Sequence, residues 1–257
     1  MLLALDAGNT NITIGLFDGK QLANRWRLAT VHNQTEDEWG ILLRNLFSIA
    51  GIELVDIEAV IIASVVPPLN PTLASMSRRY LHRDPLFVTD QTDTGITVLY
   101  DNPREVGADR VVNAVAAFQK YGGPCVVVDL GTAITFDCVS ARAEYLGGII
   151  CAGIGISIDA LFERTAKLPK VDFREPDRLI GTNTTSSIQA GLYYGSIGLI
   201  DGILERLLTE MGSQTKAIAT GGQAPLITQG SRYLKVADED LTLEGLQMIW
   251  ERNRSKH

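Results

Sequence analysis

Cysteine and histidine are scarce in this sequence. Three cysteines occur among 257 residues, Cys125, Cys138 and Cys151, and none of them belongs to a CxxC pair. The three histidines are scattered along the chain and lack the spacing of metal ligands. We therefore expect buried, reduced thiols in a cytoplasmic protein, and neither a disulfide framework nor a zinc site.

An excess of positive charge and long apolar runs are lacking as well. The 23 Lys and Arg residues are outnumbered by 30 Asp and Glu residues, so the formal charge is −7, which argues against a nucleic-acid-binding surface. No apolar run approaches the roughly 18 residues of a membrane span, and no basic leader precedes the apolar N-terminus. We therefore expect a globular protein without nucleic-acid or membrane partners.

The usual glycine-rich nucleotide motifs are also missing. No Walker GxxxxGK(S/T) motif occurs, which excludes a P-loop enzyme. Gly153-Ile154-Gly155 is only a fragment of the GxGxxG dinucleotide motif, because it lacks the third glycine and the strand-to-helix setting. The glycine turn that this chain does contain is of another kind.

That turn occurs twice, each time as an apolar strand, an Asp, one apolar residue, a Gly, polar residues and a second strand. The first copy, with Asp6 and Gly8, opens the chain, and the second, with Asp129 and Gly131, lies near its middle. Glycine lets a ligand approach the backbone, and hydroxyl, amide and backbone N–H groups bind anions. The repeat indicates an internal duplication. Two such turns facing each other would hold a phosphate chain and its cation.

The apolar pattern outside the turns supports the duplication. It predicts the order β-β-β-α-β-α-β in the first half, followed by a helix. The second half copies this order, with a long helix over residues 185–211 and a final helix over 241–252. We therefore predict an α/β fold of two duplicated domains, residues 1–115 and 116–257.

The predicted long helix contains four glycines at spacings of three or four, which places them on one broad face. Each costs roughly 1 kcal/mol of helix propensity relative to alanine. We expect close packing against this face, with a second subunit as one candidate. The four residues are Gly191, Gly195, Gly198 and Gly202.

Asp109 is the candidate general base. Gly107-Ala108 interrupts the local pattern and is followed by Asp109 and Arg110 at the start of an apolar helical face. This pair could be only a helix cap with a salt bridge. In a functional interpretation, the carboxylate orients a hydroxyl nucleophile, and the guanidinium fork of Arg110 holds an anionic substrate.

Two further segments have a structural and a functional interpretation. Gly221-Gly222 follows a strand, where it is either a plain turn or a close backbone approach to adenosine. The Ser- and Thr-rich run around Thr184 precedes the long helix. Such runs usually cap helices, and a substrate-binding hydroxyl is the alternative.

Together these motifs resemble those of the type III pantothenate kinases. The resemblance is carried by residues 6–11, 107–110, 129–133 and 219–222 and extends over nearly the whole chain. That family belongs to the acetate and sugar kinase, Hsp70 and actin superfamily. The resemblance therefore implies two ribonuclease-H-like domains with a central cleft.

The resemblance also implies where ATP and its cations bind. Asp129 would bind a monovalent cation, K⁺ or NH₄⁺, and Mg²⁺ would accompany ATP. The first turn and one residue of the second would contact ATP. These residues are Asp6, Ala7, Gly8, Asn9, Thr10, Asn11, Ile12, Thr13 and Thr132.

The implied second substrate is pantothenate, whose primary hydroxyl would lose its proton to Asp109. Tyr100 and the segment Gly107, Ala108, Asp109 and Arg110 would hold pantothenate, and Thr184 would contact it across the interface of a homodimer. The residues alone indicate an ATP-dependent phosphotransferase acting on a small anionic alcohol. A related sugar or carboxylate kinase and a non-catalytic regulatory protein of the same fold are the alternatives.

Overall fold

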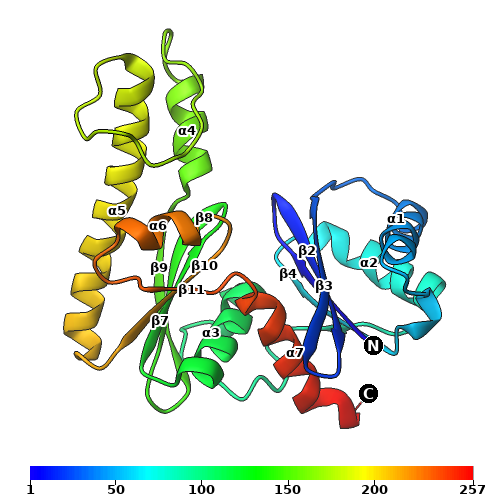
Figure 1. Cartoon of the computed structure of the whole chain (residues 1–257). Coiled ribbons are helices and arrows are strands. Elements are labelled where there is room, and N and C mark those ends of the chain that lie inside the picture. The colour runs from blue at the N-terminus through cyan, green and yellow to red at the C-terminus, as the bar shows by residue number, and fades with distance from the viewer. Residues whose placement is uncertain (257) are drawn as a thin grey trace. The chain divides into compact units, whose positions relative to one another are not determined.

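Two compact α/β units make up the chain, of which the computed structural model describes residues 1–256. Unit 1 comprises residues 1–116 and the C-terminal segment from Leu241, and unit 2 comprises Ala117–Asp240 (Figure 1). The chain crosses between the units within helix α3 (Ala108–Tyr121) and again just before helix α7 (Leu241–Asn253). The predicted fold class is confirmed.

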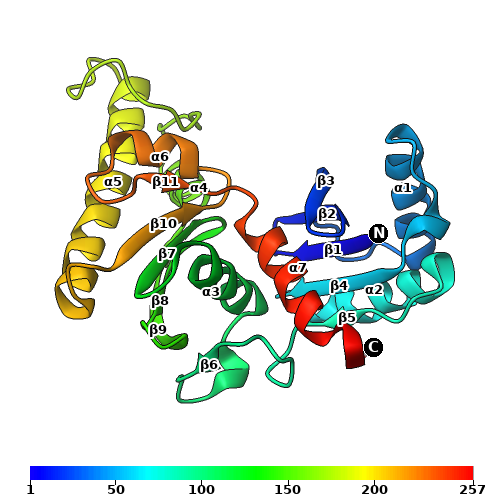
Figure 2. The same ribbon diagram turned by 60° about the horizontal axis from the view of Figure 1, so that its bottom comes forward.

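The sheet of unit 1 is covered on both faces. Its central strand β1 (Leu2–Ala7) pairs antiparallel with β2 (Asn11–Asp18) and parallel with β4 (Ala59–Ser64). Helices α1 (Glu36–Ile49) and α2 (Asn70–Met76) lie on one face of the sheet and α7 lies on the other (Figure 2). Leu3 and Leu5 of β1 pack with α1 and α2, whereas Leu2 and Ala4 pack with α7 and α3. Burial on both faces explains the uninterrupted apolar run of this strand. The strand order is β3 (Gln21–Ala29), β2 (Asn11–Asp18), β1 (Leu2–Ala7), β4 (Ala59–Ser64) and β5 (Leu86–Phe87).

Helix α1 begins with a capping box. The backbone N–H of Glu38 donates to Thr35 Oγ1 at 3.3 Å, and the backbone N–H of Thr35 donates to Glu38 Oε2 at 2.8 Å. Two N–H groups that the helix leaves without internal partners are thereby satisfied. Helix α2 continues as a π-helical turn over Ser77–Leu81 and ends at His82, which has a φ of 55°.

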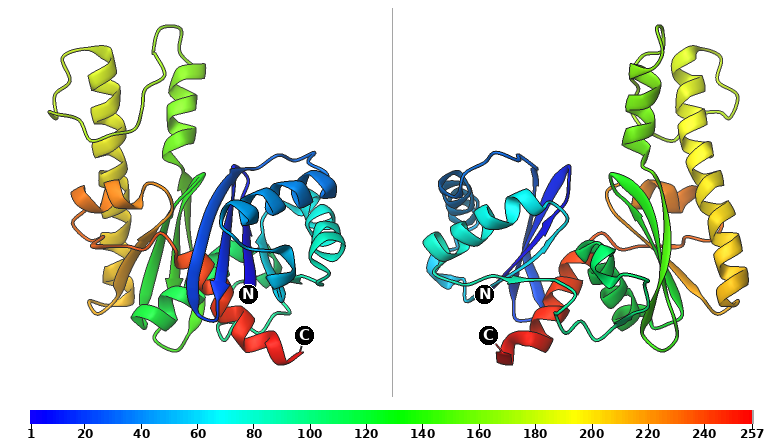
Figure 3. Two further views of the ribbon diagram at one scale, coloured as in Figure 1. Left: turned by 45° about the vertical axis from the view of Figure 1, so that its right-hand side comes forward. Right: turned by 180° about the vertical axis from the view of Figure 1, so that it is seen from behind.

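Unit 2 has a sheet of the same kind, covered on one face by helices α5 (Thr184–Met211) and α6 (Ala224–Gly230). Val126 and Val128 of the central strand pack with Ile200 of α5 and Ile227 of α6. Helices α4 (Ile154–Glu163) and α5 extend beyond the edge of this sheet (Figure 3). The strand order within the unit is β11 (Val236–Ala237), β10 (Lys216–Thr220), β7 (Cys125–Leu130), β8 (Ala133–Val139) and β9 (Glu144–Ala152).

The two sheets share one topology. In each, the first strand of the unit pairs antiparallel with the second and parallel with the fourth, and the fourth pairs parallel with the fifth. The order β3-β2-β1-β4-β5 of unit 1 thus matches β9-β8-β7-β10-β11 of unit 2. The sequence repeat is visible in only two strands of each unit. The matching strand order shows that the duplication extends over all five strands compared.

The predicted domain boundaries need one correction. The first boundary falls after residue 116, one residue from the predicted position, but the C-terminal helix belongs to unit 1 and not to the second domain. The reason is packing, because Leu243, Leu246 and Ile249 of α7 lie in one apolar cluster with Ala4 and Ala63 of unit 1. An apolar helical pattern does not reveal which sheet it covers.

Short elements complete the described chain. Within it, no helix is long and apolar enough to cross a lipid bilayer. The remaining short strand is β6 (Thr97–Val98), and the short helical turns are Leu54–Asp56, Pro67–Leu69, Pro103–Glu105 and Arg254–Lys256.

Candidate functional site

The first glycine turn joins β1 to β2 and presents its polar groups to solvent. Asp6 is half-buried at the end of β1 and stands opposite Thr13 of β2. The N–H of Gly8 donates to the carbonyl of Asn11 at 3.0 Å and closes the turn. Asn9 and Thr10 at its tip are exposed. Such a turn combines a carboxylate with accessible N–H and hydroxyl donors, which suits a phosphate group and its cation.

The second turn joins β7 to β8 and repeats this geometry with one residue fewer. Asp129, also half-buried, stands opposite Thr135. The N–H of Gly131 donates to the carbonyl of Ala133 at 3.1 Å, and Gly131 and Thr132 are exposed. The turn therefore offers the same three groups as the first: a carboxylate, backbone N–H donors and a hydroxyl.

Gly221 lies directly beside the carboxylate of Asp129. Strand β10 pairs parallel with β7 and brings Thr220 opposite Asp129, so that Gly221 follows at the carboxyl ends of both strands. A Cβ added to Gly221 would lie 2.6 Å from Asp129 Oδ1, and the φ of Gly221 is +86°. Only glycine fits this position. The Gly221-Gly222 motif and the second turn therefore form one polar surface within unit 2.

Asp109 and Arg110 lie near the first turn, also within unit 1. The N–H of Val65, just past β4, donates to the carbonyl of Ala7 at 3.0 Å. A Cβ added to Gly107 would lie 3.3 Å from Val65 Cγ1 and 2.5 Å from Asp109 Oδ1. The absence of a side chain at Gly107 thus makes room for the carboxylate of Asp109. The linking role of Val65 could not be predicted from the sequence, because it depends on the pairing of β1 with β4.

Burial raises the pKa of the Asp109 carboxyl above its ordinary value. The backbone N–H of Arg110, which donates to Asp109 Oδ1 at 2.7 Å, and the guanidinium charge of Arg110 act in the opposite direction. A carboxylate with a raised pKa is a stronger proton acceptor than an ordinary Asp. Arg110 itself is 8% exposed, so its charge is held in the interior at the start of α3.

Thr184 is the first residue of α5 and lines a hollow of unit 2. The helix is capped by its neighbours, because Asn183 Oδ1 accepts the N–H of Ser186 at 2.9 Å and Ser186 Oγ accepts the N–H of Thr182 at 3.2 Å. The hollow has a volume of about 760 Å³ and is lined by Thr184, by Leu161 of α4 and by Gly191 of α5, among others. The capping interpretation thus holds for Asn183 and Ser186, and Thr184 faces a space large enough for a small ligand.

The predicted site residues are divided between the two units. Unit 1 holds the first turn, the half-buried Tyr100 and the segment from Gly107 to Arg110; unit 2 holds Asp129, Thr132 and Thr184. Among the described residues, no three His, Cys, Asp or Glu side chains are grouped to hold a metal ion. Mg²⁺ in kinases binds through one or two carboxylates together with substrate phosphates. The single carboxylate of Asp6 in the first turn is enough for a site of this kind.

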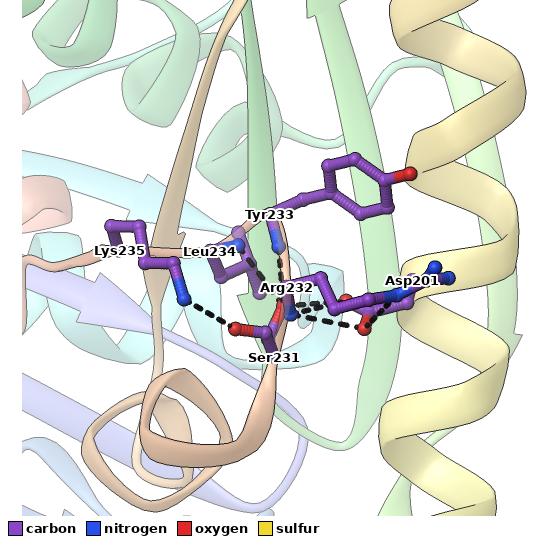
Figure 4. A network of polar contacts seen from close by, with 6 residues as sticks. All are labelled: Asp201, Ser231, Arg232, Tyr233, Leu234 and Lys235. Carbon is purple, nitrogen blue, oxygen red and sulfur yellow. Dashed lines mark hydrogen bonds and ion pairs between the residues drawn. The ribbon is translucent and has the colours of Figure 1, made fainter.

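A buried carboxylate fixes the segment that follows α6. Asp201 of α5 accepts the hydroxyl of Ser231 at 2.6 Å and the backbone N–H of Arg232 at 3.0 Å (Figure 4). The Nε of Arg232 lies 3.3 Å from the same carboxylate. Helix α6 lies between Gly221-Gly222 and Ser231 in the chain. The network therefore fixes the end of the segment that begins at the glycine pair. Nothing in the local sequence around Asp201 predicts this contact across 30 residues.

Sequence comparisons identify the family of this chain. The family model described as type III pantothenate kinase matches residues 2–206. A type III pantothenate kinase of Solibacter usitatus is 67% identical over 253 residues, covering 98% of this chain and 97% of the relative. The enzyme of the same name from Myxococcus xanthus is 51% identical over 255 residues, covering 99% and 100%.

Solved structures share the fold at low sequence identity. A Sinorhizobium meliloti protein assigned as a 2-dehydro-3-deoxygalactonokinase superposes with a TM-score of 0.65 at 13% identity, covering 99% of this chain and 96% of that protein. A Campylobacter jejuni protein assigned to the Baf family of transcriptional activators gives 0.60 at 18%, covering 98% and 99%. These structures support the fold alone, whereas the family model and the close relatives show that the chain belongs to the type III pantothenate kinase family.

Proposed function

We propose that this chain transfers the γ-phosphoryl group of ATP to the primary hydroxyl of pantothenate. The product would be 4'-phosphopantothenate, in the first step of coenzyme A biosynthesis, and the reaction would take place in the cytoplasm. Family membership supports the substrate. The observation that carries the proposal is the position of Asp109, a carboxylate of raised pKa near a turn suited to phosphate.

The first turn would bind the phosphates of ATP together with Mg²⁺. Its exposed N–H and hydroxyl groups are donors for phosphate oxygens, and the carboxylate of Asp6 would hold the ion directly or through water. For the second turn, we retain Thr132 as a proposed donor to ATP. Phosphoryl transfer depends mostly on positioning and charge stabilisation, which donors fixed in the backbone of a turn provide without reorganisation.

Asp109 would accept the proton of the pantothenate hydroxyl as its oxygen attacks the γ-phosphorus and ADP leaves. Arg110 would hold the carboxylate of pantothenate, since a guanidinium matches a carboxylate with two parallel hydrogen bonds. A carboxylate base beside a guanidinium suits a small molecule that has a hydroxyl and an anionic group. Tyr100, Gly107 and Ala108 would complete this part of the site.

Asp129 would bind a monovalent cation. Its half-buried carboxylate stands opposite the hydroxyl-bearing Thr135 and beside the bare backbone at Gly221. K⁺ and NH₄⁺ favour such oxygen-rich surroundings, and a cation at this point would offset phosphate charge.

A homodimer would cover the apolar surface of α4 and α5. A Cβ added to Gly191, Gly195 or Gly198 would meet no described heavy atom within 4 Å, so this face of α5 is open. Exposed apolar side chains also occur on β9, α4, α5 and the segment between these two helices, and apolar surface can mark interaction sites. Thr184 at the start of α5 would then lie close to the interface. These exposed apolar residues are Ile149, Ile150, Ile156, Leu161, Phe162, Leu179, Ile180, Tyr194 and Leu199.

A coupled assay of ADP release tests the proposed function. With ATP, Mg²⁺ and K⁺ present, we expect ADP release only when pantothenate is added, and no turnover of sugars or of other small hydroxy acids. Release with a sugar and none with pantothenate would favour the related-kinase alternative. Absence of turnover with every acceptor, despite nucleotide binding, would favour the regulatory alternative.

A further inference from the structure

In each unit, the residue that follows the third strand packs against the glycine turn. In unit 1 this residue is Thr30, directly after β3. Its hydroxyl donates to the carbonyl of Gly8 at 2.6 Å, and its backbone N–H donates to the carbonyl of Thr10 at 3.0 Å. Thr30 therefore holds both ends of the three-residue loop that connects β1 to β2.

In unit 2 the equivalent residue is Gly153, directly after β9. A Cβ added to Gly153 would lie 2.0 Å from the carbonyl oxygen of Thr132 and 2.8 Å from that of Gly131. The backbone of Gly153 is itself held by α4, because its carbonyl accepts the N–H and the hydroxyl of Ser157, both at 3.0 Å. The second turn thus rests on a buried backbone that has no room for a side chain.

The contact of Thr30 determines which way one donor of the first turn points. In a planar trans peptide, the C=O and the N–H of the next residue point in opposite directions. Because Thr30 holds the carbonyl of Gly8, the N–H of Asn9 is directed away from Thr30. The same bond restrains rotation of that peptide plane. Preorganised N–H donors bind anions without a reorganisation cost when the ligand arrives.

We propose that Thr30 and Gly153 are positioning residues that fix the two turns for nucleotide phosphate. The proposal rests on the proposed function only in taking ATP as the anion. Thr30 acts through a hydrogen bond from its side chain, and Gly153 acts by having no side chain. Neither residue lies in a motif that carried the family resemblance, and the duplicated topology brings both to the same place.

The variant Thr30→Val tests the hydrogen bond. Valine keeps the size and branching of threonine but cannot donate, and a hydrogen bond is worth about 0.5–1.5 kcal/mol, so we expect the Kd of MgATP to rise roughly 2- to 13-fold. The KM of pantothenate should stay within twofold of the wild-type value. Thr30→Ser, which keeps the hydroxyl, should restore nucleotide affinity. As a matched control, Thr209→Val removes a hydroxyl bond to the carbonyl of Glu205 on α5 and should leave nucleotide binding unchanged.

The variant Gly153→Ala tests whether the second turn needs a residue without a side chain at position 153. Gly155→Ala is its control. Both changes add one methyl group, but a Cβ at Gly155 would have no described heavy atom within 4 Å. We expect Gly153→Ala to weaken MgATP binding at least tenfold and Gly155→Ala to bind as wild type. If Gly153→Ala does not fold, the Thr30 variants decide the question.

Nucleotide binding is measured by equilibrium dialysis of MgATP, without pantothenate. Wild type that binds MgATP but transfers no phosphate to pantothenate would refute the proposed function and leave the positioning role open to test. An unchanged Kd in both Thr30→Val and Gly153→Ala would overturn the positioning role. The positioning role would also be contradicted if the Kd of MgATP rises in Thr30→Val and rises equally in Thr30→Ser, which keeps the hydroxyl.

Discussion

Asp129 on β7 is the direct cross-strand neighbour of Thr135 on β8. The pair has a counterpart in unit 1, where Asp6 on β1 is the neighbour of Thr13 on β2. Cross-strand neighbours have their Cβ atoms about 4.5–5.5 Å apart, so each duplicated turn has a carboxylate and a hydroxyl side by side at its base. The two copies have kept this pair although their loops differ in length by one residue.

The first prediction concerns the cation at Asp129. Replacing one carboxylate oxygen by an amide removes the charge but keeps the shape, so Asp129→Asn should lower affinity for K⁺. Because interactions with a charged group are worth about 1.5–3 kcal/mol, we expect the K⁺ concentration for half-maximal rate to rise by roughly tenfold or more. The measurement is the initial rate in K⁺ against Na⁺. Asp18→Asn, at the exposed end of β2, is the control, and equal wild-type rates in the two salts would contradict the cation's role.

The second prediction concerns pH and stability. Because burial raises the pKa of Asp109 in the folded protein, the folded chain binds this proton more tightly than the unfolded chain does. Stability from this group therefore falls as pH rises from the ordinary Asp pKa of about 3.9 through the raised value, and then levels off. Asp109→Asn should consequently melt at a higher temperature than wild type at pH 7.

Thermal unfolding followed by circular dichroism at several pH values checks this prediction. The difference between Asp109→Asn and wild type should shrink towards zero below about pH 4, where both side chains are neutral. A variant that is less stable than wild type at pH 7 would show that the attraction of the Asp109 charge to the N–H and the guanidinium of Arg110 outweighs the cost of burial.

Some parts of the fold and the site could be predicted from the sequence and others could not. The duplication could be predicted because Asp6 and Gly8 occupy the same places after an apolar strand as Asp129 and Gly131. Such a strand and the turn after it can be recognised from neighbouring residues alone. The location of α7 was not visible, because Leu243 and Leu246 cover a sheet whose strands lie far earlier in the sequence, within residues 2–87. Thr30 was missed for a related reason: only strand pairing brings it to Gly8, and a lone Thr after a strand carries no signal.

The third prediction concerns the buried carboxylate of Asp201. Asp201→Ala would leave the hydroxyl of Ser231 and the N–H of Arg232 without their present acceptor. Loss of such a buried network costs about 2–4 kcal/mol. Urea unfolding should show a fall in the free energy of unfolding of this size, while Asp177→Ala at an exposed position stays near the wild-type value. A change below 0.5 kcal/mol, at roughly the level of a surface substitution, would mean that water replaces the carboxylate.

The fourth prediction concerns the open glycine face of α5. Gly198→Arg places a long charged side chain where the proposed second subunit packs, and arginine favours the helix more than glycine does. The variant should therefore be a folded monomer, with an unchanged circular dichroism spectrum. Analytical ultracentrifugation compares it with wild type and with Thr209→Arg, which lies further along the same helix. A wild type that sediments as a monomer at all concentrations would refute the dimer.

The measurement that tests the catalytic account most directly is transfer of label from γ-³²P-ATP to pantothenate by wild type and by Asp109→Asn, with the Kd of MgATP measured for both. General-base catalysis typically contributes about 10²–10⁴-fold. The account predicts labelled phosphopantothenate from wild type, and transfer at least 10²-fold slower from Asp109→Asn at an unchanged Kd. Transfer by Asp109→Asn at a near-normal rate would contradict it.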